Sequence, residues 1–203
     1  PQEGPLLEAL HLVADSGLVT SVHAESSPLL KYFTDKLLKT GRNDPSTHGE
    51  SRPPVVEALA IAKLLTLNQQ AGASLHVAHV TSRMAVDTIR MFQEQGMNVT
   101  AETCPQYLLF TEAELAKFGS YAKINPPLRT MDDQEALWEA LKDGTLSSVA
   151  TDHSPFTVEE KEKARTDIWA APPGAPGIEE LVPGMLNAVA NGRLSIQQAV
   201  ALM

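Results

Sequence analysis

The sequence predicts an α/β protein built from parallel strand–helix units, and two observations carry this prediction. Short apolar, β-branched segments that suit buried strands alternate with longer amphipathic segments that suit helices. The alternation occurs four times within 203 residues. Four such units fit either a small doubly wound sheet or half of an eight-stranded (β/α)8 barrel, since a whole barrel takes about 250 residues. No G-x-G-x-x-G motif follows the first expected strand, which argues against a Rossmann fold.

Four segments are expected to form strands because each is short, begins apolar and ends on polar residues. They cover residues 17–25, 74–82, 97–105 and 146–156. Pro105 stops the third segment, because proline has no N–H to donate to a neighbouring strand. Alternation of these strands with helices predicts a parallel sheet whose strands are buried.

Five segments with helical periodicity accompany the strands. They cover residues 55–72, 84–96, 111–119, 131–144 and 178–192, the last despite Pro183. Thr111 with Glu114 three residues later predicts a capping box, and Gly72 predicts a helix end. Polar residues, Gly, Pro and Ser before residue 55 predict a loop with residues 41–54 as its core. We expect His48 in this loop to be solvated.

Composition excludes several classes of partner. The chain is 43% hydrophobic and 20% charged, with a net charge of -9 and a pI near 5.1. Nucleic-acid binding needs a basic surface, so a small-molecule partner is expected instead. No apolar run approaches the ~20 residues that span a bilayer, and the start lacks a secretory pattern, which predicts a cytoplasmic protein without a membrane partner. Cys104 is the single cysteine, so a metal site would have to use His and carboxylate ligands.

Side chains that can bind a metal or move a proton stand at the ends of all four expected strands. They are His23 with Glu25, then His79, then Glu102 with Cys104, then Asp152 beside His153. Active sites of parallel α/β folds assemble at this edge of the sheet. Two imidazoles and a carboxylate there suit a divalent metal such as zinc, and metal-assisted hydrolysis is the reaction class that follows.

Each of these side chains also has a purely structural interpretation. A histidine at a strand end commonly bonds a backbone carbonyl, and Asp152 can cap a turn in its Asp-x-x-Pro context. Glu102 can serve as a buried hydrogen-bonding residue, and Cys104 as a small hydrophobic one. His76 has the opposite side-chain parity to His79, so we expect it to face the helix layer or solvent. The set as a whole, more than any member, indicates a metal site.

Five motifs in order resemble those of the cyclic amidohydrolases, the dihydropyrimidinase/hydantoinase, allantoinase and dihydroorotase group of the amidohydrolase superfamily. The motifs are "VHAE", "HVAHVTS", "AETCPQYL", "KINPPLR" and "ATDHSPF", and the resemblance covers residues 17–182. It implies that residues 1–203 are a partial barrel domain of a longer chain, the C-terminal half (strands 5 to 8) of a TIM-type (β/α)8 barrel. A half-barrel would expose sheet edges and its strand-lined interior, and alone it is expected to be inactive.

The resemblance also assigns roles to residues. Such enzymes hold two zinc ions, and it implies that His23 and His79 bind one of them at the ends of strands 5 and 6. Asp152, at the end of strand 8, would bind the other and act as proton shuttle while a metal-bound hydroxide attacks the ring carbonyl. A His-x-His pair and a carbamylated Lys complete the family's ligand set and have no counterpart in this chain. Asn125, Pro173 and Gly174 would contact the substrate.

The markers for a particular substrate conflict. "ETCPQYL" and Phe156 are similar to hydantoinases and dihydropyrimidinases, Asn125 is similar to dihydroorotases, and "DHSP" also occurs in allantoinases. The resemblance therefore implies a zinc-dependent hydrolase of a small cyclic amide, in a homo-oligomer, without fixing the ring. The alternatives are a non-catalytic dihydropyrimidinase-like scaffold and an unrelated α/β binding domain. His23, His79 and Asp152 together favour the enzyme, because a scaffold has no chemical need for all three.

Overall fold

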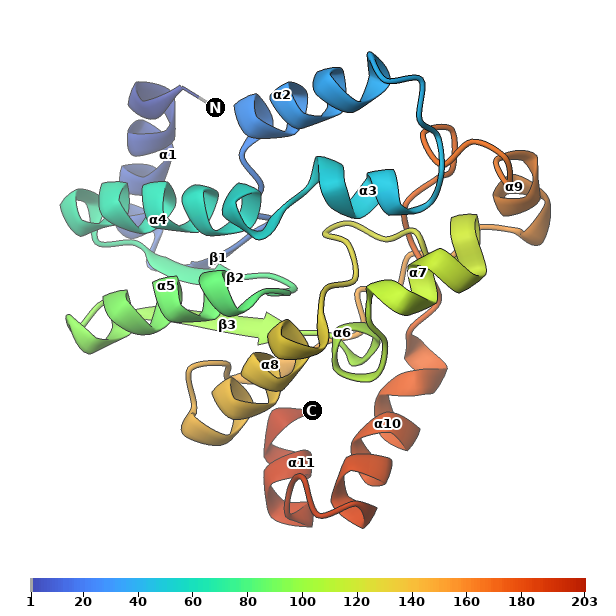
Figure 1. Cartoon of the computed structure of the whole chain (residues 1–203). Helices are drawn as coiled ribbons and strands as arrows, with labels where there is room; N and C mark the ends of the chain where they lie inside the picture. The colour runs from blue at the N-terminus through green and yellow to red at the C-terminus, as the bar shows by residue number, and fades with distance from the viewer. Residues whose placement is uncertain (1) are drawn as a thin grey trace.

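Four parallel strands form one sheet in the computed structural model, which describes residues 2–203 (Figure 1). The strands are β1 (Val19–Val22), β2 (Ser74–Val77), β3 (Val99–Thr103) and β4 (Ser148–Val149). They lie in the sheet in chain order, so every crossover leads to the adjacent strand. A doubly wound sheet reverses its strand order at a switch point, whereas a barrel does not. The predicted fold class, half of a (β/α)8 barrel, is therefore confirmed.

Helices connect the strands and extend beyond them. They are α1 (Glu3–Ser16), α2 (Ser27–Leu38), α3 (Ser46–Ser51), α4 (Pro54–Ala71), α5 (Arg83–Glu94), α6 (Pro105–Leu109), α7 (Glu112–Phe118), the 3₁₀ helix η1 (Gly119–Ala122), α8 (Met131–Asp143), α9 (Val158–Lys163), α10 (Ile178–Ala190) and α11 (Ile196–Leu202). The capping box of Thr111 and Glu114 begins α7, and Gly72 ends α4 with a left-handed φ of 74°. No described helix is long and apolar enough to cross a membrane.

The helices α4, α5 and α8 pack side by side against one face of the sheet (Figure 1). Strand side chains that point to this face form the core, and Leu75, Val77 and Ala101 are at most 2% exposed. The opposite face carries His76 in register with Thr100, and Thr100 is exposed. The strands are thus buried on one face only, because no described part of the chain covers the face that would line a barrel interior.

The edges of the sheet are open as well. Within residues 2–203, β1 pairs only with β2 and β4 only with β3. At the β1 edge Leu18 is 70% exposed and Val19 is 66% exposed. The expectation that a half-barrel exposes its edges and interior is met.

The long loop expected before residue 55 is the part of the fold that the sequence prediction gets wrong. Helices α2 and α3 occupy most of it. Pro28 stands in the first turn of α2, where a missing N–H costs nothing. The apolar residues of α2 have helical spacing, but the helix buries no residue completely, and the polar, Gly, Pro and Ser residues around it dominated the prediction.

His48 is likewise buried rather than solvated. It lies in α3, is 3% exposed, and its Nε2 is 2.7 Å from the carbonyl oxygen of Ile124. Burial lowers the pKa of His48 to about 3 from its ordinary 6.5, with the nearby charges of Lys123 and Arg52 adding to the effect. His48 is therefore a neutral structural residue that joins α3 to the segment leading to Asn125.

His48 predicts a pH dependence of stability. The unfolded chain takes up a proton on His48 below about pH 6.5, and the folded chain does so only near pH 3, so this contribution is complete above pH 6.5 and is lost as the pH falls through that window. We expect His48→Gln to flatten the fall in the free energy of unfolding, measured by urea titration, between about pH 6.5 and 4. His11→Gln, at an exposed position on α1, is the control. Equal pH profiles of His48→Gln and the unaltered chain would contradict this role.

Candidate active site

Two histidines meet at the carboxyl ends of neighbouring strands. His23 follows β1 and His79 follows β2, and the Nδ1 atom of His23 is 2.9 Å from the Nε2 atom of His79. Their rings pack edge to face, with centroids 4.7 Å apart. The parallel register, which pairs Val22 with Val77, brings the two strand ends together. One nitrogen lone pair from each ring can thus be directed at a common point.

Left-handed backbone marks two of the predicted site residues. Among residues 2–203, His79 (φ 40°) and Asp152 (φ 44°) are the only residues other than glycine with a positive φ. A side chain in this region costs on the order of 1 kcal/mol or more, and proteins retain such residues mostly at functional sites. The chain holds this conformation at the ends of β2 and β4, where the sequence predicted a metal ligand and a proton shuttle.

A buried carboxylate stands behind His23. Glu25 Oε2 is 3.0 Å from His23 Nε2 and accepts a hydrogen bond from Arg52. The Glu25 side chain is 2% exposed, whereas that of His23 is 48% exposed. Burial acts to raise the pKa of Glu25, but the hydrogen bonds and charges of His23 and Arg52 outweigh it and lower the pKa. Glu25 is therefore an ionised acceptor for the His23 ring.

His79 lies deeper than His23 and is 8% exposed. Burial lowers the pKa of His79, and the neighbouring His23 lowers it further, against an opposite effect of Asp152. A metal binds imidazole in its neutral form, so this shift suits a ligand. The Nδ1 atom of His79 is buried without a hydrogen-bond partner in the described chain. The nitrogen that faces His23 is the other one, Nε2.

A buried polar network supports the loops that carry both histidines. Glu57 of α4 accepts hydrogen bonds from the backbone N–H of Thr81 and from the Thr81 and Ser82 hydroxyls, at 2.7–2.8 Å. Arg129 donates through Nε to the Thr81 hydroxyl, at 3.0 Å, and through a second nitrogen to the carbonyl of Arg52. The segment after His79 and the residue that holds Glu25 are thereby fixed to one another.

The predicted substrate-contact residues lie beside one another. The N–H of Gly174 donates to the carbonyl of Lys123, at 2.9 Å, two residues before Asn125. Asn125 has a buried side-chain oxygen without a hydrogen-bond partner. Gly174 is buried and Pro173 is exposed. A Cβ on Gly174 would collide with the Ser154 carbonyl, so glycine is required where this loop meets the segment after Asp152.

Asp152 lies on the surface of the edge, apart from the two imidazoles. It is exposed, although its charge affects both His79 and Cys104. Its neighbour His153 has a different role, because His153 Nδ1 accepts hydrogen bonds from the N–H groups of Gly177 and Ile178 at 3.1 and 3.4 Å. His153 thus ties the strand end to the start of α10.

Three other polar candidates do not join this site. His76 contacts the Thr100 hydroxyl at 2.8 Å and Glu102 at 3.1 Å, all on the open face of the sheet. The expectation placed His76 toward the helix layer or solvent. The side chain lies on the face away from the helices, is 19% exposed, and gives Glu102 a partner other than His79. Cys104 is fully buried, and burial raises the pKa of its thiol far above the ordinary value, as expected for a structural cysteine.

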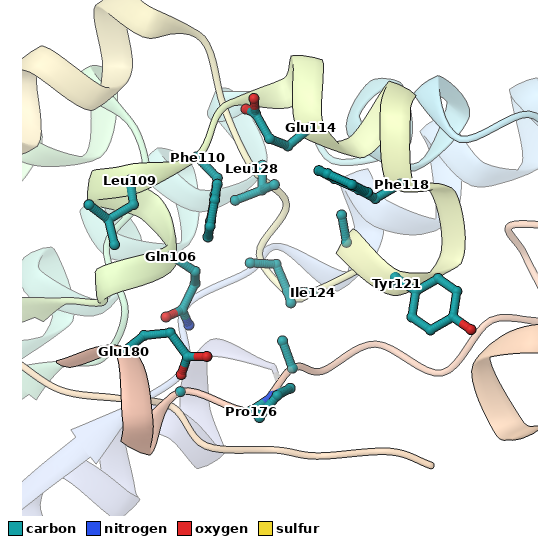
Figure 2. A pocket seen from close by; sticks show the side chains of 13 residues that line it. Gln106, Leu109, Phe110, Glu114, Phe118, Tyr121, Ile124, Leu128, Pro176 and Glu180 are labelled. Carbon is teal, nitrogen blue, oxygen red and sulfur yellow. The ribbon is translucent and has the colours of Figure 1, made fainter. Parts of the chain in front are cut away.

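A separate apolar cavity of about 220 Å³ lies between α6, α7, η1 and the start of α10 (Figure 2). Figure 2 shows Phe110, Phe118 and Ile124 around it, with Gln106 and Glu180 at one side. None of the six predicted site residues lines it. Gln106 links it to the edge of the sheet, because its amide donates to the carbonyl of Thr151 at 3.3 Å.

The residues present fit part of a metal site. Within residues 2–203, no three His, Cys, Asp or Glu side chains lie close enough together to hold a metal ion. His23 and His79 nevertheless offer two nitrogens at 2.9 Å, close to the separation of two ligands on one zinc ion with bonds of about 2.0 Å. The chain therefore supplies a histidine pair, and further ligands would have to come from outside the cluster.

The fold and site together define a class: a parallel half-barrel with a histidine pair and a carboxylate at the carboxyl ends of its strands. No protein-family model matches the chain. Curated relatives do. A D-hydantoinase of Rhizobium radiobacter is 38% identical over 202 residues, which are 98% of this chain and 44% of the relative. An allantoinase of Rubrobacter xylanophilus is 36% identical over 93% of this chain and 41% of the relative.

Two further matches agree with these. A dihydroorotase of Syntrophotalea carbinolica is 44% identical over 151 residues, which are 74% of this chain and 35% of the relative. A crystal structure of a D-hydantoinase superposes with a TM-score of 0.95 at 36% identity, covering all of this chain and 45% of that one. The chain thus spans less than half the length of these relatives. By sequence and fold it belongs to the cyclic amidohydrolase group.

The sequence pointed to the histidine pair but not to the residues that position it. Arg129 stands in the "KINPPLR" motif and Glu57 interrupts an apolar helix segment. A charged residue on the buried face of an amphipathic helix is the signal that could have identified Glu57. Lys123 begins the same motif, but its partners and that of Arg52 are distant in the sequence, so no local pattern indicated their roles.

The contacts of Lys123 lead to a prediction for the loop that carries Pro173 and Gly174. Its ammonium group donates to the carbonyls of Ile168 and Ala171, at 2.6 and 2.7 Å, and burial lowers its pKa to about 8. Lys123→Met would leave these carbonyls unsatisfied, at a cost of about 1–3 kcal/mol. We expect faster hydrogen exchange at the Gly174 amide, measured by mass spectrometry. Lys142→Met, at an exposed site on α8, is the control; unchanged exchange in Lys123→Met would show that other contacts hold the loop.

Proposed function

We propose that this chain contributes half of the barrel and half of the active site of a metal-dependent cyclic amidohydrolase. The observation that carries the proposal is the 2.9 Å approach of His23 Nδ1 and His79 Nε2 at adjacent strand ends. The relatives named hydantoinase, allantoinase and dihydroorotase support the reaction class, hydrolysis of a C–N bond in a cyclic amide. The left-handed conformations of His79 and Asp152 support the same site.

Zinc is the metal that we propose for the histidine pair. Neutral imidazoles suit zinc, and the lowered pKa of His79 favours the neutral form. A bound divalent cation lowers the pKa of water to about 7 and polarises a carbonyl, which an unactivated amide requires. The remaining ligands would come from the part of the relatives that this chain does not span, which exceeds half of their length.

Asp152 is the proposed proton carrier. It stands at the end of β4, and its carboxylate acts electrostatically on His79. It would take the proton from the attacking water and deliver it to the ring nitrogen as the C–N bond breaks.

The substrate proposed is a five- or six-membered cyclic amide or imide. Asn125 offers a buried amide oxygen without a partner, which can accept from a ring N–H. The N–H of Gly174 already donates to Lys123, so Gly174 would use its carbonyl, with Pro173 beside it. The rings are those handled by the named relatives: hydantoins, allantoin and dihydroorotate. A non-catalytic scaffold is disfavoured, because it would not need His23, His79 and Asp152 together.

Asp152→Asn tests the proposal in the full-length enzyme. Loss of a general acid–base typically slows turnover by 10²–10⁴-fold, so we expect kcat on a panel of hydantoin, dihydrouracil, allantoin and dihydroorotate to fall at least ~100-fold. Asp87→Asn, on the surface of α5, should leave kcat unchanged. Zinc content of the full-length enzyme should approach about two ions per chain. Undiminished hydrolysis by Asp152→Asn would refute the proton-carrier role.

A further inference from the structure

The starting point is the position of Glu25 between two partners. Its Oε2 atom lies 3.0 Å from His23 Nε2 and accepts a hydrogen bond from Arg52. The Glu25 side chain is 2% exposed and that of Arg52 is 20% exposed. A buried carboxylate needs such partners, because an unpaired charge in the interior is costly. Glu25 therefore has one well-defined place in the structure.

The position of Glu25 determines which ring nitrogen of His23 carries the hydrogen. Glu25 Oε2 lies against both the guanidinium of Arg52 and His23 Nε2, and a carboxylate oxygen paired with arginine accepts hydrogen bonds, so His23 Nε2 is the donor. A neutral imidazole that is protonated at Nε2 has its lone pair on Nδ1. That is the atom that faces His79 Nε2 at 2.9 Å. Glu25 thus selects the tautomer in which His23 can act as a ligand beside His79.

We propose that Glu25, clamped by Arg52, is a positioning residue that fixes the tautomer and ring orientation of His23 for binding a divalent cation together with His79. The inference rests on the proposed function, because that function supplies the cation. Outer carboxylates that orient a ligand histidine commonly change metal affinity by 10–100-fold when they are removed.

Arg52 is itself anchored to the loop that carries His79. Its backbone carbonyl accepts a hydrogen bond from Arg129, and Arg129 Nε donates to the Thr81 hydroxyl at 3.0 Å. Thr81 stands two residues after His79 and is fully buried. The Glu25–Arg52 pair beside His23 and the loop of His79 are therefore joined by hydrogen bonds. A change at Glu25 or Arg52 is expected to alter the geometry of the His23–His79 pair.

The test compares Glu25→Gln with the unaltered full-length enzyme in two measurements. The first is the Zn²⁺ affinity by calorimetry, where we expect a 10–100-fold loss. The second is a long-range ¹H–¹⁵N spectrum of the metal-free protein, where His23 should be protonated at Nε2 in the unaltered protein and divided between both tautomers in Glu25→Gln. Glu135→Gln, which removes the Glu135–Arg193 ion pair at a half-exposed position away from the histidine pair, is the control.

Arg52→Gln provides a second variant that keeps Glu25 in place. Its partly exposed position should tolerate the change, and we expect a smaller loss of Zn²⁺ affinity in the same direction. Equal Zn²⁺ affinity of Glu25→Gln and the unaltered protein would overturn the positioning role and leave the proposed function intact. Absence of Zn²⁺ binding in the unaltered full-length enzyme would overturn the proposed function, whereas a His23 ring that keeps one tautomer in Glu25→Gln would overturn the positioning role.

Discussion

The geometry of both histidines depends on the burial of one carboxylate, that of Glu57. Its side chain is 2% exposed and accepts from the Thr81 backbone, the Thr81 hydroxyl and the Ser82 hydroxyl. Burial raises the pKa of Glu57 despite these donors and despite Arg129, 3.8 Å away. A group so far from water keeps its partners because no solvent can replace them. The segment after His79 is thereby fixed to helix α4.

The hydrogen bonds of Glu57 and Arg129 orient the site side chains, which strand pairing alone does not do. The parallel ladder sets Val22 opposite Val77, which determines how far apart the two strand ends lie. It does not determine the rotation of the side chains that follow, because each belongs to a separate strand–helix connection. Arg129 joins these connections by bonding both the Thr81 hydroxyl and the Arg52 carbonyl. Strand pairing therefore places the histidines, and the buried polar contacts orient them.

Periodicity predicted those parts of the fold that depend on local pattern. Helices α4, α5, α8 and α10 lie where apolar spacing placed them, because each buries an apolar stripe against the sheet or a neighbouring helix. Helices α2 and α3 were missed, since α2 buries no residue completely. His48 was misjudged because its burial depends on Ile124, 76 residues away. No local pattern records a contact of that kind.

At the candidate site, too, residues with a local pattern were predicted and residues with distant contacts were not. His23, His79 and Asp152 were predicted because each ends a strand, and strand ends of a parallel sheet share one edge. Arg52 and Arg129 were not assigned roles, because their contacts join positions 27 and 77 residues apart. Glu25 stands only two residues from His23, but no sequence pattern shows that its carboxylate turns back to the His23 ring. Motif order thus identifies the reacting groups more readily than the groups that orient them.

The two sides of the His23 ring differ in exposure. This difference links the open face of the sheet to the incomplete set of ligands at the candidate site. Glu25 is 2% exposed behind His23, while the His23 side chain is 48% exposed. Glu25 has two partners within this chain, His23 and Arg52, although its Oε1 atom has none among the described residues. The ligand side is open, as is the sheet face that carries His76 and Thr100. Whatever closes that face also approaches the exposed side of the histidine pair. Under the proposed function, the part of the barrel that covers this face would also bring the remaining metal ligands to the histidine pair.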